Sequence, residues 1–418
     1  MPEKKKALSM IISLLVIMSL LPGIIAGAWD FTSTEKTLDE LPIIPEFIAF
    51  IYDFVSPPKS LEEFEPFKTS YVEGSGVENI DISPDGKFVI SSTGRTVNFW
   101  DTKDGDDFYG YHVMNDGSSA TVEDHEPHRN IIDTEFSMTG NYYLVGSNND
   151  ESWAYDEIPA SHLTLYNMTH SIGVASRTFR THQINDIFIE DTAISPDETI
   201  YAACTEMTAD PERCTITFWD IETGEVVNSI TSDNYKATSI TFTPDGKYLV
   251  ASFANSINPD RIVFFDLESG DIVRTLEERA VADLQFSDDG KILAAGSLGL
   301  SEVIVWDGSS YEEMYRLRGL ELPPYSTALS RDGKYIMSMD FARLIIWDTD
   351  SKRKIVSSRS LKLNFTRSFS AGTFSDDGKY LVLALNAKRG SQYAEQFDYK
   401  SGMVFIYDFE EILDAYYE

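Results

Sequence analysis

Imidazole and carboxylate side chains, which together could bind a divalent transition metal, gather in one region of this 418-residue sequence. All six histidines lie between positions 112 and 182, and acidic residues stand among them. Zinc and related metals accept such mixed nitrogen and oxygen ligands. The candidate binding residues are His125, Glu126, His128, Asp150, Glu151, His162, His182 and Asp186.

The spacing of these histidines argues against a dedicated metal centre. His125 and His128 are separated by two residues and, together with His182, are weak candidates for metal ligands. They lack the helical spacing that places both histidines of a metalloprotease motif on one helix face. We therefore expect a solvated polar surface without a metal or cofactor. No G-x-S-x-G nucleophile elbow occurs, so no catalytic residue is assigned.

Charge and the N-terminal residues limit where the protein works and what it binds. The formal net charge is −34, which repels phosphate backbones and excludes nucleic acid as a partner. Residues 1–28 combine three lysines, an apolar run and Ala26-Gly27-Ala28, which is the layout of a signal peptide. The apolar run is also long enough for an uncleaved membrane anchor. Both interpretations place the remaining chain outside the cytoplasm, either secreted or at the cell surface.

The only two cysteines, Cys204 and Cys214, flank a short segment between two strand-like runs. Disulfides persist outside the cytoplasm. We therefore expect a disulfide that braces this segment. The alternative is a pair of small buried residues.

The elements that would position these side chains come from a segment that recurs seven times. Its first half reads as a strand, a tight turn with Pro-Asp-Gly or a close variant, and a second strand. A β-branched and aromatic run then gives a third strand, and several copies continue into a turn and a fourth. The third strands are 96–101, 163–167, 215–220, 261–266, 303–307, 344–348 and 404–408.

The Asp-Gly turns and the aromatic-Asp strand ends, such as Trp219-Asp220 and Trp347-Asp348, resemble those of WD-repeat-like and YVTN-like β-propellers. The resemblance implies an all-β, seven-bladed propeller of four-stranded antiparallel blades. At this recurring position we expect Trp100, Trp219, Trp306 and Trp347 to pack between blades rather than to bind sugars. No repeat has the Gly-His dipeptide that opens a standard WD repeat, so the hydrogen-bond relay of that family is not expected.

The expected domain organisation follows from the repeats. Residues 1–28 are the signal peptide or anchor, 29–65 form a connector with room for a short helix, 66–408 form the propeller, and 409–418 are a C-terminal tail. The seventh repeat ends after its third strand. We therefore expect Pro66–Val72 to supply the fourth strand and to close the ring by pairing N-terminal and C-terminal strands. We expect a monomer.

Insertions between strands indicate a binding face, because repeat arrays often carry insertions on the face that binds. They fall at 115–130, 147–161, 180–191 and 385–402, with a smaller one at 205–214. Strand counting places all of them at the face opposite the Asp-Gly turns, together with His125, His128, His162 and His182. Blades four to six would serve as scaffold.

We therefore interpret the protein as an extracytoplasmic binding scaffold that presents a loop-rich acidic face to a protein, a peptide or a cell-surface polymer. The alternative is a metal- or cofactor-dependent propeller enzyme, lactonase-like or quinoprotein-like, that acts at the same mouth. Propellers support both kinds of function, so the fold alone does not decide between them.

Overall fold

The computed structural model describes residues 57–73, 77–93, 96–102, 129–149, 160–168, 178–185, 187–207, 213–233, 235–255, 259–359, 367–387 and 400–417. One compact unit spans Pro58–Glu418, and the fold below is the fold of that unit. The signal peptide expected at residues 1–28 lies outside the described residues. Within the described ranges, no helix combines the length and the apolar character that a membrane crossing needs.

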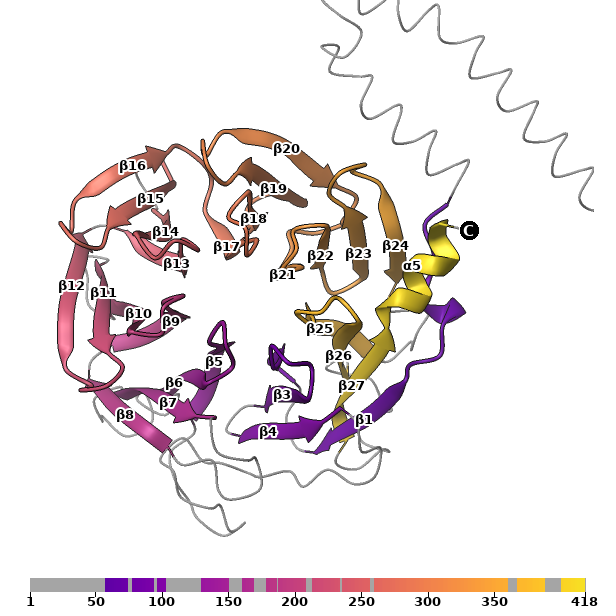
Figure 1. The fold of residues 1–418 in the computed structure, drawn as a ribbon, viewed down its shortest axis with the longest axis horizontal. Helices are drawn as coiled ribbons and strands as arrows, with labels where there is room; N and C mark the ends of the chain where they lie inside the picture. The colour runs from indigo at the N-terminus through magenta and orange to yellow at the C-terminus, as the bar shows by residue number, and fades with distance from the viewer. Residues whose placement is uncertain are drawn as a thin grey trace, which may run out of the picture. The chain divides into compact units, whose positions relative to one another are not determined.

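The described strands form antiparallel sheets around a central axis, which is the arrangement of a β-propeller (Figure 1). Within a blade the strands follow one another from the centre outwards. Five blades are continuous in sequence. One consists of β5 (Arg129–Phe136), β6 (Tyr142–Asn149), β7 (Ala160–Asn167) and β8 (Thr178–Asn185), and the next consists of β9 (Ile187–Ile194), β10 (Ile200–Met207), β11 (Arg213–Asp220) and β12 (Val226–Asp233). The third consists of β13 (Lys236–Phe242), β14 (Tyr248–Ala254), β15 (Arg261–Asp266) and β16 (Ile272–Leu276), and the fourth consists of β17 (Val281–Phe286), β18 (Ile292–Ser297), β19 (Glu302–Asp307) and β20 (Glu313–Arg318). The fifth consists of β21 (Ser326–Leu329), β22 (Tyr335–Met339), β23 (Arg343–Asp348) and β24 (Lys354–Arg359).

A sixth four-stranded blade combines the two ends of the unit. Its first three strands are β25 (Arg367–Phe374), β26 (Tyr380–Ala387) and β27 (Lys400–Asp408). Its outer strand is β1 (Lys68–Glu73), which pairs antiparallel with β27 so that Lys68 lies opposite Ile406. The expected pairing of an N-terminal with a C-terminal strand is therefore present.

The remaining sheet has three described strands, β2 (Asn79–Ile82), β3 (Phe88–Thr93) and β4 (Thr96–Asp101). The sequence predicted seven four-stranded blades, whereas the structure shows six. The difference arises in this repeat, because residues 103–128, where its fourth strand would lie, are outside the described residues. The inner strand β2 lies between the inner strands β25 and β5.

The tight turns between the first and second strands form as the sequence predicts. In each of the seven sheets a Ser or Thr follows the first strand, and its hydroxyl accepts the backbone N–H of the residue five positions later. In the first turn Asp85 accepts the Ser83 hydroxyl and the Lys87 N–H. Gly86 has a φ of 66°, a conformation that glycine adopts without strain. Glu198 takes this place in the β9–β10 turn with a φ of 55°.

The aromatic residues at the ends of the third strands pack between blades, as expected. Trp219, Trp306 and Trp347 are buried, whereas the side chain of Trp100 lies outside the described residues. Trp306 lies in a hydrophobic cluster with Val250 and Phe264 of the preceding blade. These residues therefore hold neighbouring sheets together rather than present rings to a ligand.

The segment expected as a C-terminal tail is a helix, α5 (Phe409–Tyr417). Phe409, Ile412 and Tyr416 form one apolar stripe, and all three are buried. Leu61, from the short 3₁₀ helix η2 (Leu61–Glu63), joins the same cluster. The sequence analysis did not predict this helix, because four apolar positions at helical spacing in so short a segment are weak evidence without the surface that they cover.

The expected disulfide is absent, and both cysteines are free and buried. In the ladder between β10 and β11, Cys204 lies opposite Ile216, and Cys214 lies opposite Glu206. The two cysteines are therefore diagonal neighbours rather than a directly opposed pair, and diagonal Cα atoms lie farther apart than a disulfide spans. They fill the hydrophobic core between β10, β11 and the next blade.

One predicted insertion is also wrong. Residues 180–191 belong to β8 and β9, with only position 186 between these strands. Residues 168–177 connect β7 to β8, and the strand ends that they connect lie at the face of the Asp-Gly turns. β8 was missed because an outer strand is solvent-exposed over much of its surface and needs no clear apolar alternation.

Candidate functional site

The structure brings together few of the residues that the sequence proposed as a binding site. His125, Glu126, His128, Asp150, Glu151 and Asp186 lie outside the described residues. His162 is buried on β7, and His182 lies on the outer strand β8 rather than in an interblade connection. No group of three or more His, Cys, Asp or Glu residues in the described part of the chain could hold a metal ion.

His182 packs between two blades. Its ring stacks on Trp219 with the centroids 5.4 Å apart, and its Nε2 hydrogen-bonds with the Tyr201 hydroxyl. Burial and, to a smaller degree, the charge of Arg180 lower the pKa of His182 below its ordinary value. The placement in a loop was therefore incorrect, because the interblade packing of an outer strand depends on the neighbouring blade and is not visible in the local sequence.

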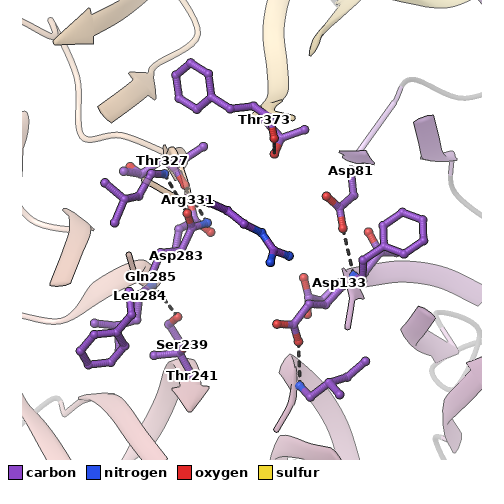
Figure 2. Close-up of a pocket in the computed structure, with 18 of the residues that line it drawn as sticks. Asp81, Asp133, Ser239, Thr241, Asp283, Leu284, Gln285, Thr327, Arg331 and Thr373 are labelled. Carbon is purple, nitrogen blue, oxygen red and sulfur yellow. Dashed lines mark hydrogen bonds between the residues drawn. The ribbon is translucent and has the colours of Figure 1, made fainter. Parts of the chain in front are cut away.

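A polar cavity of about 330 Å³ lies at the centre of the propeller (Figure 2). Its walls are the first strands of all seven sheets, and it is lined by carboxylates, hydroxyls and a single arginine side chain. Two positions in each first strand supply most of these groups. They lie four and two residues before the Ser or Thr that begins the turn, and alternate residues of a strand face the same side. We call them the first and second inner positions.

Four side chains at the first inner position bind the backbone of the following blade. Each accepts the N–H of the residue that follows the first inner position in the next sheet. The pairs are Asp133 Oδ2 with Thr192 N at 3.0 Å, Asp191 Oδ2 with Ile240 N at 2.7 Å, Ser239 Oγ with Leu284 N at 3.0 Å, and Asp283 Oδ2 with Thr327 N at 2.7 Å.

Side chains at the second inner position, two residues further along the strand, form equivalent hydrogen bonds. Here each side chain accepts the N–H of the last residue before the turn of the next sheet. The pairs are Asp81 Oδ2 with Phe136 N at 3.0 Å, Glu135 Oε2 with Ile194 N at 2.8 Å, and Gln285 Oε1 with Leu329 N at 2.8 Å. Because a first strand is the inner edge of its sheet, its central N–H groups lack a ladder partner, and these acceptors satisfy them.

Burial changes the acidity of these carboxyl groups. It raises the pKa of Asp81 and of Asp283 to about 7. Burial and the neighbouring charge of Asp133 raise the pKa of Glu135 and of Asp191 well above their ordinary values. In each case the backbone N–H donor favours the charged form but does not outweigh burial.

Arg331 extends across the end of the cavity at the Asp-Gly turns (Figure 2). It belongs to the turn between β21 and β22. Its Nε lies 2.6 Å from Asp376 Oδ1, and its Nη1 donates to the Met138 carbonyl at 3.2 Å and lies 3.8 Å from Asp288 Oδ2. The guanidinium thus connects three further turns and places positive charge above the buried carboxylates.

The sequence contained a signal for this site that the loop-based interpretation did not use. Asp, Glu, Gln, Ser or Thr recurs at the two inner positions of most repeats, although a strand facing a packed core would carry apolar residues there. The geometry shows that these groups join blades and leave a small polar cavity. Their hydrogen bonds are structural in character rather than an acid and a base held apart for proton transfer.

The raised pKa values predict that the protein loses stability as the pH rises through 7. The ordinary aspartate pKa is 3.8, and that of Asp283 is about 7, so between these values the folded chain binds more protons than the unfolded chain. Asp283→Asn keeps an acceptor for Thr327 and cannot ionise. In urea titrations we expect this variant to gain on the order of 1 kcal/mol in unfolding free energy at pH 8, with a smaller gain at pH 5.

Asp289→Asn is the matched control from the next turn of the same blade. Its hydrogen bonds with Lys291 lower the pKa of Asp289 to about 2, so its removal should destabilise the protein at both pH values. A loss of stability in Asp283→Asn at pH 8 that equals the loss at pH 5 would contradict the account.

Comparison with known proteins gives one partial match. A family model described as WD domain, G-beta repeat, matches residues 65–101. The matched segment contains β1, the outer strand of one blade, followed by β2, β3 and β4 of the next sheet. No curated protein matches the sequence. The chain is thus a β-propeller that resembles a WD repeat over this segment.

Proposed function

We propose that the protein is an extracytoplasmic binding scaffold, and that its partner is a protein, a peptide or a cell-surface polymer. The observation that carries the proposal is the position of the strand ends that bound two long connections between second and third strands. Residues 150–159 join β6 to β7, and residues 388–399 join β26 to β27. Both pairs of strand ends lie at the face opposite the Asp-Gly turns, because second-to-third and first-to-second connections alternate between faces. We call this the loop face.

The regular blades show how unusual these connections are. β22 and β23 are joined at the same face by residues 340–342 alone. Additional residues in a repeat array that do not build the framework are commonly used for binding. The match to a WD repeat at residues 65–101 supports the proposal, since repeats of this kind commonly mediate protein interactions. No observation among the described residues favours the enzymatic alternative.

We propose further that the ring has seven blades and is of the WD-like or YVTN-like kind. The position of β2 between β25 and β5 supports a seventh blade built on β2, β3 and β4. The pairing of β1 with β27 supports closure of the ring through the two ends of the unit. Closure of this type removes the sheet edges at which a propeller could open.

The extracytoplasmic location depends on residues 1–28. Cleavage after Ala28 would leave a mature chain that begins at Trp29. We expect mass measurement of the native protein to show this N-terminus, because the small residues Ala26 and Ala28 suit a signal peptidase. A native mass that includes residues 1–28 would favour the anchored form, and recovery of the protein from the cytoplasm would contradict the proposed location.

The binding face is tested by shortening connections on the two faces of one blade. Residues 150–159 connect strand ends at the loop face, and residues 169–177 connect the ends of β7 and β8 at the opposite face. We expect replacement of 150–159 by a short turn to reduce cross-linking to surface partners on native cells by about tenfold, if it removes contacts worth roughly 1.4 kcal/mol. Replacement of 169–177 is the matched control and should leave cross-linking within about twofold.

A second variant, with 388–399 shortened, checks the same face from another blade. Thermal unfolding of all three variants establishes that the propeller is intact. If partners are captured equally well after both loop-face replacements, the loop face is not the binding surface.

A further inference from the structure

Among the described residues the outer edge of β16 is unpaired, whereas the equivalent edge of β24 is paired with another segment of the same chain. In five consecutive blades the outer strand has an extra residue opposite the end of the third strand, which forms a β-bulge. The side chain of this residue in β8 lies outside the described residues, so the comparison concerns the other four blades. The equivalent bulge residues are Val227 in β12, Val273 in β16, Met314 in β20 and Ile355 in β24. Ile355 is fully buried, whereas Val227, Val273 and Met314 are 54%, 52% and 43% exposed, respectively.

The edge of β24 shows what such a strand accepts. Lys59 forms a parallel bridge with Val356. Its N–H donates to the Ile355 carbonyl at 2.8 Å, and its carbonyl accepts the Ser357 N–H at 2.9 Å. Two residues later Leu61 enters the hydrophobic cluster that contains Ile355. An extended segment of this chain therefore adds to the outer edge through two backbone hydrogen bonds and one aliphatic side chain.

Two of the other three edges are protected by their own side chains. In β12 the N–H equivalent to that of Ser357 belongs to Ser229, and it donates to Asn228 Oδ1 at 2.8 Å. In β20 the equivalent residue is Arg316, which forms ion pairs with Glu278, Glu302 and Glu313. Charged groups of this kind discourage the addition of another strand.

The edge of β16 carries neither form of protection. Its equivalent groups are the Val273 carbonyl and the Thr275 N–H, and within the described ranges no backbone hydrogen bond reaches them from outside the sheet. Arg274, between them, points towards the neighbouring blade, with its guanidinium 5.3 Å from the centre of the Tyr311 ring. It therefore does not guard the edge.

Apolar and acidic side chains surround this open edge. Ile272 and Val273 are each about half exposed. Glu268, Asp271 and Glu277 are exposed at the two ends of β16, where they would attract basic residues.

We propose that the outer edge of β16 is a docking site for an extended, basic segment of a partner protein that adds to the blade as a fifth strand. Its backbone bonds with the Val273 carbonyl and the Thr275 N–H, as Lys59 does with β24. Its aliphatic side chains cover Ile272 and Val273, and its Lys or Arg residues meet Glu268, Asp271 and Glu277. This site lies on the outer rim and is separate from the loop face.

The experiment uses the full-length protein and a synthetic hexapeptide of alternating lysine and valine, blocked at both ends. We expect the peptide to bind and to slow amide hydrogen exchange at Thr275. Thr275→Pro removes the outward N–H without touching the ladder to β15, and Val273→Ser removes the aliphatic contact. Each should weaken binding at least tenfold in fluorescence anisotropy titrations, and so should backbone N-methylation of the peptide.

Val227→Ser is the matched control, because Val227 holds the same bulge position with nearly the same exposure in the protected strand β12. It should leave affinity within twofold. Circular dichroism of each variant confirms folding, and Val273→Ser keeps the test independent of any distortion by proline. The proposal is overturned if the peptide does not bind, if Val273→Ser binds as tightly as the parent protein, or if Val227→Ser loses affinity equally.

Discussion

The first strand of each blade presents an unpaired edge to the centre of the propeller, and satisfying its N–H groups is the constraint on which the structure depends. A buried backbone donor without an acceptor costs about as much free energy as a lost hydrogen bond. Asp133, Asp191 and Asp283 meet this need by reaching into the next blade. Since each acceptor belongs to one blade and each donor to the next, the same interactions also hold the ring together.

This use of carboxylates determines the chemistry of the centre. Burial, with a smaller contribution from neighbouring carboxylates, raises the pKa of Asp81 and Asp283 to about 7. Arg331 supplies positive charge at only one end of the cavity. The centre is thus a polar structural core, and we propose that binding takes place at the loop face and at the outer edge of one blade.

The sequence predicted the elements whose signals are local. The Ser or Thr and Asp-Gly turns and the aromatic strand ends such as Trp347 follow from short patterns that need no knowledge of neighbouring blades. The pairing of β1 with β27 follows from counting the strands of the repeats, because the seventh repeat lacks its fourth strand. The structure differed where a residue's role depends on contacts from another blade. His182 stacks on Trp219 of the next blade, and the cysteines are placed by a ladder register that spacing does not reveal. α5 exists because a surface is available to bury Phe409 and Ile412.

Amide hydrogen exchange in an Asp191 variant tests the central claim most directly, namely that inner carboxylates hold one blade to the next. In the parent protein the Ile240 N–H donates to Asp191 Oδ2 and should be protected from exchange. Asp191→Ala should accelerate exchange at Ile240 by roughly tenfold or more, the loss of one hydrogen bond, while Asp191→Asn, which retains an acceptor, should preserve protection. Equal protection of Ile240 in the parent protein and in Asp191→Ala would contradict the account.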